Sequence, residues 1–240
     1  MKQQLMKVIS NKHLNGVIYE MILEGDCKGM VQGQFVEVSV EGFYLRRPIS
    51  ICDVTDDTVT LVYKVVGDGT KVMSKVTEGV KLDVITHLGN GFPLDAKRPL
   101  LVGGGIGSAP LYNLAKEFNK LGIRPMIVLG FRNKDEIFYE DKFKEVGDLI
   151  ITTDDGSVGY HGNAVNYLKE NIVDFDKYYS CGPMIMMHFL KLYSEEGYMS
   201  LEARMGCGFG VCMGCSIQTK EGFKRVCKEG PVFSAGILEI

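Results

Sequence analysis

Four of the seven cysteines stand close together near the end of the 240-residue chain. They are separated by four, two and eleven residues, and they are Cys207, Cys212, Cys215 and Cys227. This spacing is the plant-type ligand pattern for a 2Fe–2S cluster. Glycines between the cysteines let backbone N–H groups turn toward the sulfur atoms and leave room for a bulky inorganic core. We therefore predict that these four residues hold a 2Fe–2S cluster.

Structural zinc is the main alternative for the same cysteines, and free thiols without a ligand are the other. Zinc sites usually pair cysteines as C-x2–4-C twice over, whereas Cys227 stands alone after the first three. The remaining cysteines are scattered. Cys27 and Cys52 are expected in the core, and Cys181 is either a buried structural residue or a catalytic one. An odd number of cysteines without a secretory signal argues against a disulfide framework.

A glycine-rich turn follows an apolar segment in the middle of the chain. The sequence LLVGGGIGSAP runs from Leu100 to Pro110, and its turn consists of Gly103, Gly104, Gly105, Ile106 and Gly107. Backbone N–H groups at the start of a following helix attract a pyrophosphate. The pattern is not the full G-x-G-x-x-G, and such a turn can be plain strand-to-helix geometry. Its place at the first β–α crossover favours dinucleotide binding.

Basic and hydroxyl residues in the first half form a second candidate phosphate site. In Arg47-Pro48-Ile49-Ser50, the arginine can bind a phosphate and the serine can hydrogen-bond a ring nitrogen. Gly69-Thr70 precedes a short helix expected over Lys71–Val76, whose start can bind a second phosphate group. A solvated strand end is the structural alternative for the basic pair that Arg47 forms with Arg46. Together the motifs predict two nucleotides, one in each half of the chain.

The hydrophobic pattern predicts the elements that position these residues. Apolar residues alternate along Gly16–Leu23, Gln34–Val40 and Thr58–Val66, which predicts a small antiparallel β-barrel. Beyond Pro93 strands alternate with helices, which predicts a parallel sheet. The expected strands are Leu100–Val102, Met126–Leu129, Leu149–Thr152 and Lys177–Ser180, and the expected helices are Leu111–Leu121, Glu136–Val146, Gly162–Lys169 and Met184–Tyr193. The predicted fold class is β plus α/β, with a barrel domain at 1–95, an α/β domain at 96–198 and a small cysteine-loop domain at 199–240.

Composition excludes several classes of function. With 27 basic and 30 acidic residues the net charge is −3, so there is no electrostatic case for nucleic-acid binding. No apolar run reaches the roughly 18 residues of a membrane span, and the first residues lack the core of a signal peptide. Glycine makes up 29 residues, about 12% against a usual ~7%, which suggests backbone brought close to ligands. We expect a cytoplasmic protein that contacts no membrane.

The order of the motifs resembles that of the ferredoxin–NADP reductase superfamily. The resemblance rests on Arg47-Pro48-Ile49-Ser50, Gly69-Thr70, the turn at 103–107 and Cys181-Gly182-Pro183. With the cysteine loop that follows Ser200-Leu201-Glu202-Ala203-Arg204-Met205, essentially the whole chain resembles the electron-transfer subunits of type B dihydroorotate dehydrogenases.

The resemblance implies roles for individual residues. It implies an FAD site in the barrel domain, with Arg47 at the pyrophosphate, Ser50 near flavin N5, and Gly69 and Thr70 at the phosphates. Ile49 stands where many relatives place an aromatic ring, so flavin stacking must come from elsewhere. The segment Val62-Tyr63-Lys64 would contact FAD, with Tyr63 a stacking partner. The resemblance further implies NAD binding in the α/β domain, at the turn from Gly103 to Gly107 and beside the nicotinamide at Cys181, Gly182 and Pro183. The carboxylate that some relatives carry near the flavin has no clear match.

The resemblance also implies a function that depends on a partner. A 2Fe–2S cluster passes single electrons, NAD accepts two as a hydride, and FAD converts between the two modes. Electrons would originate at FMN in a separate subunit that oxidises dihydroorotate to orotate in pyrimidine biosynthesis, and two copies of each subunit would form the complex. The apolar tail at 231–233 and 237–240 is expected to contact the partner or to pack against the barrel. The alternatives are a flavin/iron–sulfur subunit of a hydrogenase or a ferredoxin–NADP transhydrogenase, and a zinc-stapled nucleotide-binding regulator.

Overall fold

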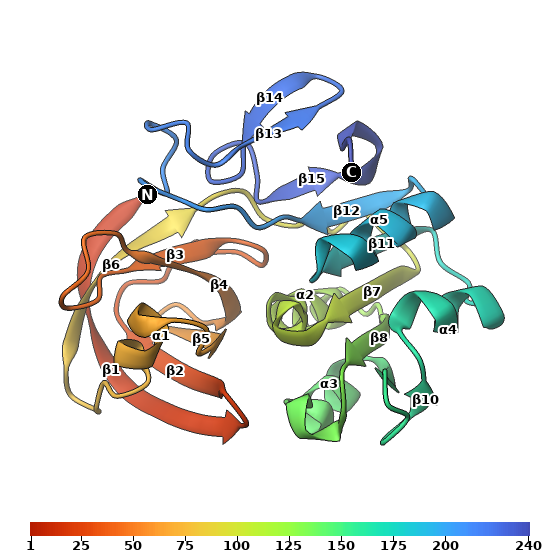
Figure 1. Cartoon of the computed structure of the whole chain (residues 1–240), viewed down its shortest axis with the longest axis horizontal. Coiled ribbons are helices and arrows are strands. Elements are labelled where there is room, and N and C mark those ends of the chain that lie inside the picture. Colours follow the sequence, from red (N-terminus) through yellow and green to blue (C-terminus); the bar gives the residue numbers. More distant parts are fainter.

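The first third of the chain closes into an antiparallel barrel, which confirms the prediction from alternating apolar residues (Figure 1). A computed structural model describes all of residues 1–240. The barrel strands follow the order β1-β2-β5-β4-β3-β6. Their bounds are β1 (Lys2–Asn15), β2 (Ile18–Glu24), β3 (Phe35–Val38), β4 (Arg47–Val54), β5 (Thr58–Lys64) and β6 (Lys81–Leu88). Inward-facing side chains such as Met21, Val36 and Leu61 are fully buried in its core.

A seven-stranded sheet forms the second unit, and it is parallel except at one edge, which confirms the α/β prediction. The order is β10-β9-β8-β7-β11-β12-β15, with only β15 antiparallel to its neighbour. The bounds are β7 (Pro99–Gly104), β8 (Met126–Phe131), β9 (Asp148–Thr153), β10 (Tyr160–His161), β11 (Lys177–Cys181), β12 (Gly197–Ser200) and β15 (Val232–Ser234). Strands β7 and β8 are almost continuously apolar, and β11 is buried along most of its length, because helices cover both faces of the sheet.

The helices divide between the two faces of this sheet. One face carries α2 (Ala109–Lys120) and α3 (Glu140–Val146), and the other carries α4 (Ala164–Glu170) and α5 (Met184–Tyr193). Helix α2 packs against barrel strand β4, and one hydrophobic cluster joins the two units. That cluster includes Cys52 and Val62 of the barrel together with Ala109 and Phe118 of α2. The barrel and the α/β unit therefore share a core rather than only a linker.

Helix α2 begins two residues before and ends one residue before its predicted bounds, and three other helices differ from their predictions for local reasons. The first helix, α1 (Asp68–Met73), begins earlier than Lys71 because the Thr70 hydroxyl accepts the N–H groups of Val66 and Gly67 and fixes the start of the turn. The stretch expected as one helix from Glu136 is divided into the 3-10 turn Lys134–Glu136 and α3, because Tyr139 adopts left-handed backbone angles between them. Helix α4 begins at Ala164 rather than Gly162, because the side chain of Asn163 caps it.

The cysteine segment lies across the end of the barrel and the edge of the sheet, as the blue part of Figure 1 shows. It contains the hairpin of β13 (Ser216–Thr219) and β14 (Gly222–Arg225). The sheet strand β15 and the 3-10 turn Ala235–Ile237 follow it. The apolar tail packs mainly in the α/β sheet, because Val232, Phe233 and Leu238 are buried there. The remaining 3-10 turn spans Gly105–Ser108. No helix is long and apolar enough to cross a membrane.

Candidate functional site

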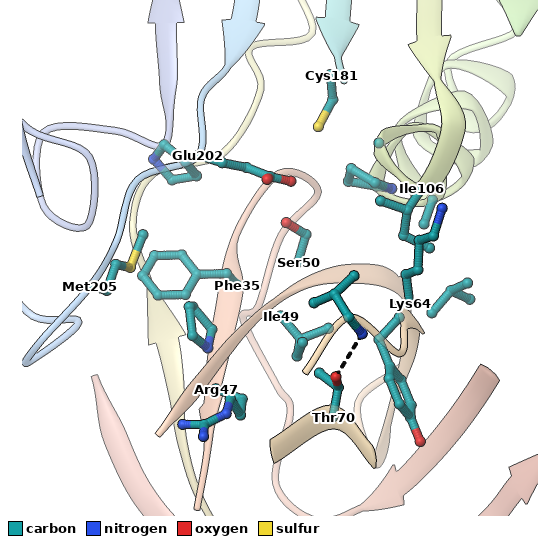
Figure 2. A pocket seen from close by; sticks show the side chains of 18 of the residues that line it. Phe35, Arg47, Ile49, Ser50, Lys64, Thr70, Ile106, Cys181, Glu202 and Met205 are labelled. Carbon is teal, nitrogen blue, oxygen red and sulfur yellow. Dashed lines mark hydrogen bonds between the residues drawn. The ribbon is translucent and has the colours of Figure 1, made fainter. Parts of the chain in front are cut away.

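A cavity of about 340 Å³ opens between the barrel, the α/β unit and the segment that follows β12 (Figure 2). Almost all of the predicted flavin residues line it. They come from β4, β5 and α1, and they are Arg47, Pro48, Ile49, Ser50, Val62, Tyr63, Lys64 and Thr70. Residues without a sequence motif complete the wall, among them Phe35, Met205 and Pro231. The barrel thus brings three separate motifs to one concave surface.

Gly69 does not line this cavity but lies directly against Arg47. A Cβ atom at Gly69 would overlap the Arg47 guanidinium, so only glycine leaves room for the arginine at the start of α1. The guanidinium lies 4.5 Å from the centre of the Phe43 ring and donates to the carbonyl of Leu45. Its position is therefore fixed from two sides, and the guanidinium lies against Gly69 at the start of α1. This cradle suits an anionic group such as a pyrophosphate.

Tyr63 is held by its own contacts. Its ring stacks on Tyr19 with centroids 5.9 Å apart, and its hydroxyl donates to Oδ1 of Asn11 at 3.0 Å. Burial raises the pKa of Tyr63, so the hydroxyl remains protonated. Tyr63 lines the cavity as a residue, but the ring that was predicted to stack on a flavin packs into the barrel core.

A second cavity of about 630 Å³ lies at the carboxyl ends of the parallel strands. Most of the predicted dinucleotide residues line it, namely Gly104, Gly105, Ile106, Gly107, Gly182 and Pro183. Gly103 lies outside it and is packed under Ser108. Cys181 is absent from it and lines the first cavity instead. The carboxyl edge of a parallel sheet is where such folds bind ligands.

The glycine turn and the segment at 181–183 touch each other. A Cβ atom at Gly107 would lie 2.5 Å from Cα of Gly182, and one at Gly104 would lie 2.5 Å from Cδ of Pro183. Gly105 has a φ of +53°, which side chains rarely adopt. The turn therefore needs glycine for close approach at two positions and for backbone conformation at a third.

The two cavities adjoin, and four residues line both: Lys64, Ile106, Gly107 and Glu202. Figure 2 shows the carboxylate of Glu202 pointing toward the Ser50 hydroxyl, with the Cys181 thiol directed to the same space. Desolvation raises the pKa of Glu202, and burial raises that of Cys181 to about 12. A protonatable carboxyl and a neutral thiol thus face the junction.

The sequence motifs indicate no clear match for a carboxylate near the flavin, and the structure places Glu202 on the lining of both cavities. Glu202 lies two residues beyond the end of β12, and the chain then crosses the junction toward the cysteines. Glu202 belongs to the segment from Ser200 to Met205 on which the resemblance partly rests, but no local pattern there indicates a position near Ser50. The fold brings it there, because the chain leaves the sheet at the end of β12.

The four clustered cysteines form two pairs rather than one compact group of metal ligands. Sγ of Cys215 lies 3.2 Å from Sγ of Cys227, and both residues are buried. Sγ of Cys207 accepts the N–H groups of Val211 at 3.3 Å and Cys212 at 3.4 Å. Two thiol pairs fit a cluster of two irons, in which four cysteines share two metals.

The environments of the two pairs differ. Burial acts to raise the pKa of Cys207, but the backbone N–H groups around it outweigh this effect and lower the pKa to about 6. Burial and the adjacent Cys215 thiol raise the pKa of Cys227 to about 12. The surroundings of Cys207 therefore favour a thiolate, whereas Cys227 would need the positive charge of a metal to lose its proton.

The loop rests on the barrel at Gly208, where the φ is +75°. A Cβ atom there would overlap the side chain of Glu37, which is 1% exposed. Oε1 of Glu37 has no hydrogen-bond partner, and burial raises the pKa of this carboxyl to about 7 although Arg46 lowers it. In β3, Phe35 lies two residues before Glu37 and lines the first cavity. Side chains two residues apart in a strand point to the same face, so the cysteine loop and the predicted flavin cavity contact the same outer face of β3.

Comparison with known proteins identifies the relatives of this chain. Residues 202–239 match the family described as the iron–sulfur cluster binding domain of dihydroorotate dehydrogenase B. The electron transfer subunit of dihydroorotate dehydrogenase B (NAD(+)) from Fusobacterium nucleatum is 43% identical, with all of both chains covered. The subunit of the same name from Lysinibacillus sphaericus is 41% identical over 100% of this chain and 99% of its own. The chain belongs to the family of dihydroorotate dehydrogenase B electron transfer subunits.

Solved structures agree on the fold. An NADH-dependent reduced ferredoxin–NADP oxidoreductase, studied for flavin-based electron bifurcation, aligns with a TM-score of 0.88 and 29% identity over 98% of this chain and 90% of its own. Phthalate dioxygenase reductase aligns with a TM-score of 0.70 and 18% identity over 90% of this chain and 86% of its own. The sequence-based expectation of a ferredoxin–NADP reductase architecture is therefore confirmed. The family membership favours neither a hydrogenase or transhydrogenase subunit nor a zinc-stapled regulator.

Proposed function

We propose that this protein is the electron-transfer subunit of a dihydroorotate dehydrogenase, linking a 2Fe–2S cluster through FAD to NAD+. The observation that carries the proposal is the junction of the two cavities. One cavity gathers the flavin motifs, the other gathers the dinucleotide motifs, and they share Lys64, Ile106, Gly107 and Glu202. Two redox groups bound there would meet at their reactive ends. A third site, the cysteine loop, packs on the same barrel at Glu37.

The chemistry of transfer comes from the bound groups, since FAD exchanges single electrons with a hydride and a 2Fe–2S cluster passes single electrons. The chain supplies binding and orientation. We infer that Arg47 and the α1 start at Gly69 and Thr70 hold the FAD pyrophosphate. Val62, Tyr63 and Lys64 form the wall beside the flavin ring, and Ser50 gives its polar edge a hydrogen bond.

The dinucleotide site works by close backbone approach. The turn from Gly103 to Gly107 presents N–H groups to the NAD pyrophosphate at the start of α2. Cys181, Gly182 and Pro183 bound the nicotinamide end, where the buried neutral thiol of Cys181 offers a nonpolar surface rather than a nucleophile. Glu202, with its raised pKa, can hold a proton beside the two rings. The four cysteines hold the cluster, two for each iron.

The cysteine loop also presents an apolar surface beside its ligands. Phe209, Val211 and Met213 are exposed around Cys207 and Cys212, and Cys212 is itself exposed. Electron transfer needs close approach of redox groups, so an exposed ligand with an apolar rim suits the docking of an electron donor. We infer that the donor is an FMN-containing catalytic subunit that oxidises dihydroorotate, and that the complex contains two copies of each chain.

The test is reconstitution of electron transfer with and without the partner. The purified chain with FAD and cluster should oxidise NADH with an artificial electron acceptor but should not oxidise dihydroorotate. Addition of the FMN-containing partner should give dihydroorotate-dependent reduction of NAD+, and the complex should have the mass of two copies of each chain. Reduction of NAD+ by dihydroorotate without a partner would overturn the assignment. The assignment would also be overturned if reduced ferredoxin, but not dihydroorotate with the partner subunit, supplied electrons for the reduction of NAD+.

A further inference from the structure

An ion pair joins the strand that carries the flavin motif to the helix that begins at the dinucleotide turn. Nζ of Lys116 in α2 lies 2.6 and 2.7 Å from the two carboxylate oxygens of Asp53 in β4. The side chains are about a quarter exposed, 28% for Lys116 and 25% for Asp53. The Tyr112 ring lies 5.7 Å from the same ammonium group. The pair is therefore partly shielded from water, where an ion pair is stronger than on an open surface.

The backbone of β4 is irregular at the point where it presents Asp53. The pairing of β4 with β5 shifts register between Ile51 and Asp53, which is the signature of a β-bulge at Cys52. Ile51 points into the barrel core, whereas Cys52 belongs to the cluster shared with α2 and Asp53 reaches the same helix. In a regular strand Asp53 would face the barrel interior, since side chains alternate. The bulge turns the carboxylate toward Lys116.

The pair lies at the far end of two elements that meet at the junction. Asp53 is three residues beyond Ser50 in β4, or roughly 10 Å along an extended strand. Lys116 is seven residues beyond Ala109, or roughly 10 Å along α2. Ser50 and Ala109 both line the flavin cavity. An anchor at these matched distances fixes how far α2 can slide along β4, and hence where the dinucleotide turn faces the flavin site.

Other interdomain contacts join the barrel to the region of α3 rather than to α2. Glu20 of β2 accepts from the Tyr139 hydroxyl and from Nζ of Lys142 at 3.2 Å, on the side of α3. Nζ of Lys64 lies 3.6 Å from Glu136, in the loop before α3. Loss of the ion pair between Asp53 and Lys116 therefore leaves the two units joined by a shared core and by these contacts.

We propose that Asp53 and Lys116 are positioning residues for hydride transfer, because they set the register of the nicotinamide-binding turn against the flavin-binding strand. This inference rests on the proposed function. In the reaction a hydride leaves NADH, which is oxidised to NAD+, and FAD takes up this hydride and one proton and is reduced. Neither Asp53 nor Lys116 touches the reacting atoms; they act through β4 and α2.

The test compares variants of the cofactor-loaded chain in anaerobic stopped-flow experiments with NADH. Lys116→Met and Asp53→Asn should lower the limiting rate of flavin reduction by about 10- to 100-fold, since a misplacement of about 1 Å can cost about 100-fold. The apparent Kd for NADH should change by less than about threefold. The long-wavelength absorbance of the stacked nicotinamide and flavin should weaken in the same variants. Lys116→Arg keeps the cation and should stay within about threefold of the wild-type rate.

The matched control is Lys120→Met on the same helix, because Lys120 pairs only with Glu117 of α2 itself. This variant should leave both the rate and the absorbance band unchanged. The proposal is overturned if Lys116→Met and Asp53→Asn keep the wild-type rate, or if Lys116→Arg is as slow as Lys116→Met. If Lys116→Met and Asp53→Asn both lose bound FAD or show a large drop in Tm, the ion pair serves folding rather than positioning, and the proposal is overturned. Failure of NADH to bleach the wild-type flavin would instead refute the proposed function, and the inference with it.

Discussion

The junction of the two cavities and the cysteine loop are built in opposite ways. The junction lies between regular elements, where α2 and β4 share a buried cluster and an ion pair. The cysteine loop has almost no regular structure before β13, and its contact with the barrel is a glycine against the unpaired carboxyl of Glu37. Hydride transfer demands positioning within about 1 Å, whereas a loop that binds a cluster takes its order from the metal ligands. The difference indicates that the junction is preformed and that the loop depends on the cluster.

Gly107→Ala should damage the junction most. The added Cβ would lie 2.5 Å from Cα of Gly182, so the turn and the nicotinamide segment must separate. We expect NADH oxidation to fall by about 100-fold or more, with FAD and iron content unchanged. Steady-state kinetics and cofactor analysis measure both quantities. Gly236→Ala is the control, because its nearest neighbour is 3.8 Å from the new Cβ. Normal NADH oxidation in Gly107→Ala would show that the dinucleotide binds elsewhere.

Cys212→Ser should have the complementary effect on the loop. Cys212 is the most exposed of the four predicted ligands, and a hydroxyl is a poor replacement for a thiolate on iron. We expect the cluster to be lost or weakly bound while FAD largely remains. Iron, labile sulfide and flavin are measured after anaerobic purification. Cys27→Ala, a core cysteine far from the loop in sequence, should retain full iron. Equal loss of FAD and iron would contradict the separation of the two regions.

Glu37 gives the loop contact a pH dependence. Its folded-state pKa of about 7 lies above the ordinary value of 4.5, so folding favours the protonated carboxyl. The stabilising effect is complete below about pH 4.5 and is lost as the pH rises through 7, by an amount on the order of 3 kcal/mol. Urea unfolding followed by tyrosine fluorescence at pH 5 and pH 8 measures it. Glu37→Gln should flatten this dependence, whereas the surface variant Glu41→Gln should leave it intact. A pH profile unchanged by Glu37→Gln would refute this origin.

Arg47→Ala should produce the smallest of these effects. Loss of a charge-assisted hydrogen bond to phosphate should weaken FAD binding by about 1.5–3 kcal/mol. Fluorescence titration of the FAD-free protein gives the affinity. Arg46→Ala is a close control, because Arg46 pairs with Asp83 rather than lining the cavity. Equal FAD affinity in Arg47→Ala and the wild type would place the flavin pyrophosphate at another site.

The sequence allowed the fold class and the separate motifs to be predicted, because alternation, glycine turns and cysteine spacing are local signals. Asp53 carries no such signal, and the segment around Glu202 supports the resemblance without indicating that this carboxylate lies at the junction. Glu202 reaches the junction only because β12 ends there, and Asp53 faces α2 only because of a bulge at Cys52. Strand β1 was not singled out, since its outer face is polar and only Met6 and Val8 are fully buried. The features that the sequence did not predict depend on contacts between residues far apart in the chain, which local patterns do not encode.

An anaerobic titration of the purified single chain with NADH tests the central claim most directly. Visible absorbance follows the flavin, electron paramagnetic resonance follows the cluster, and metal analysis counts iron, sulfide and zinc. We predict two irons and two labile sulfides per chain, with NADH bleaching the flavin and then producing the signal of a reduced cluster. Stoichiometric zinc without labile sulfide, or a flavin that NADH reduces without any electron reaching the cluster, would contradict the account.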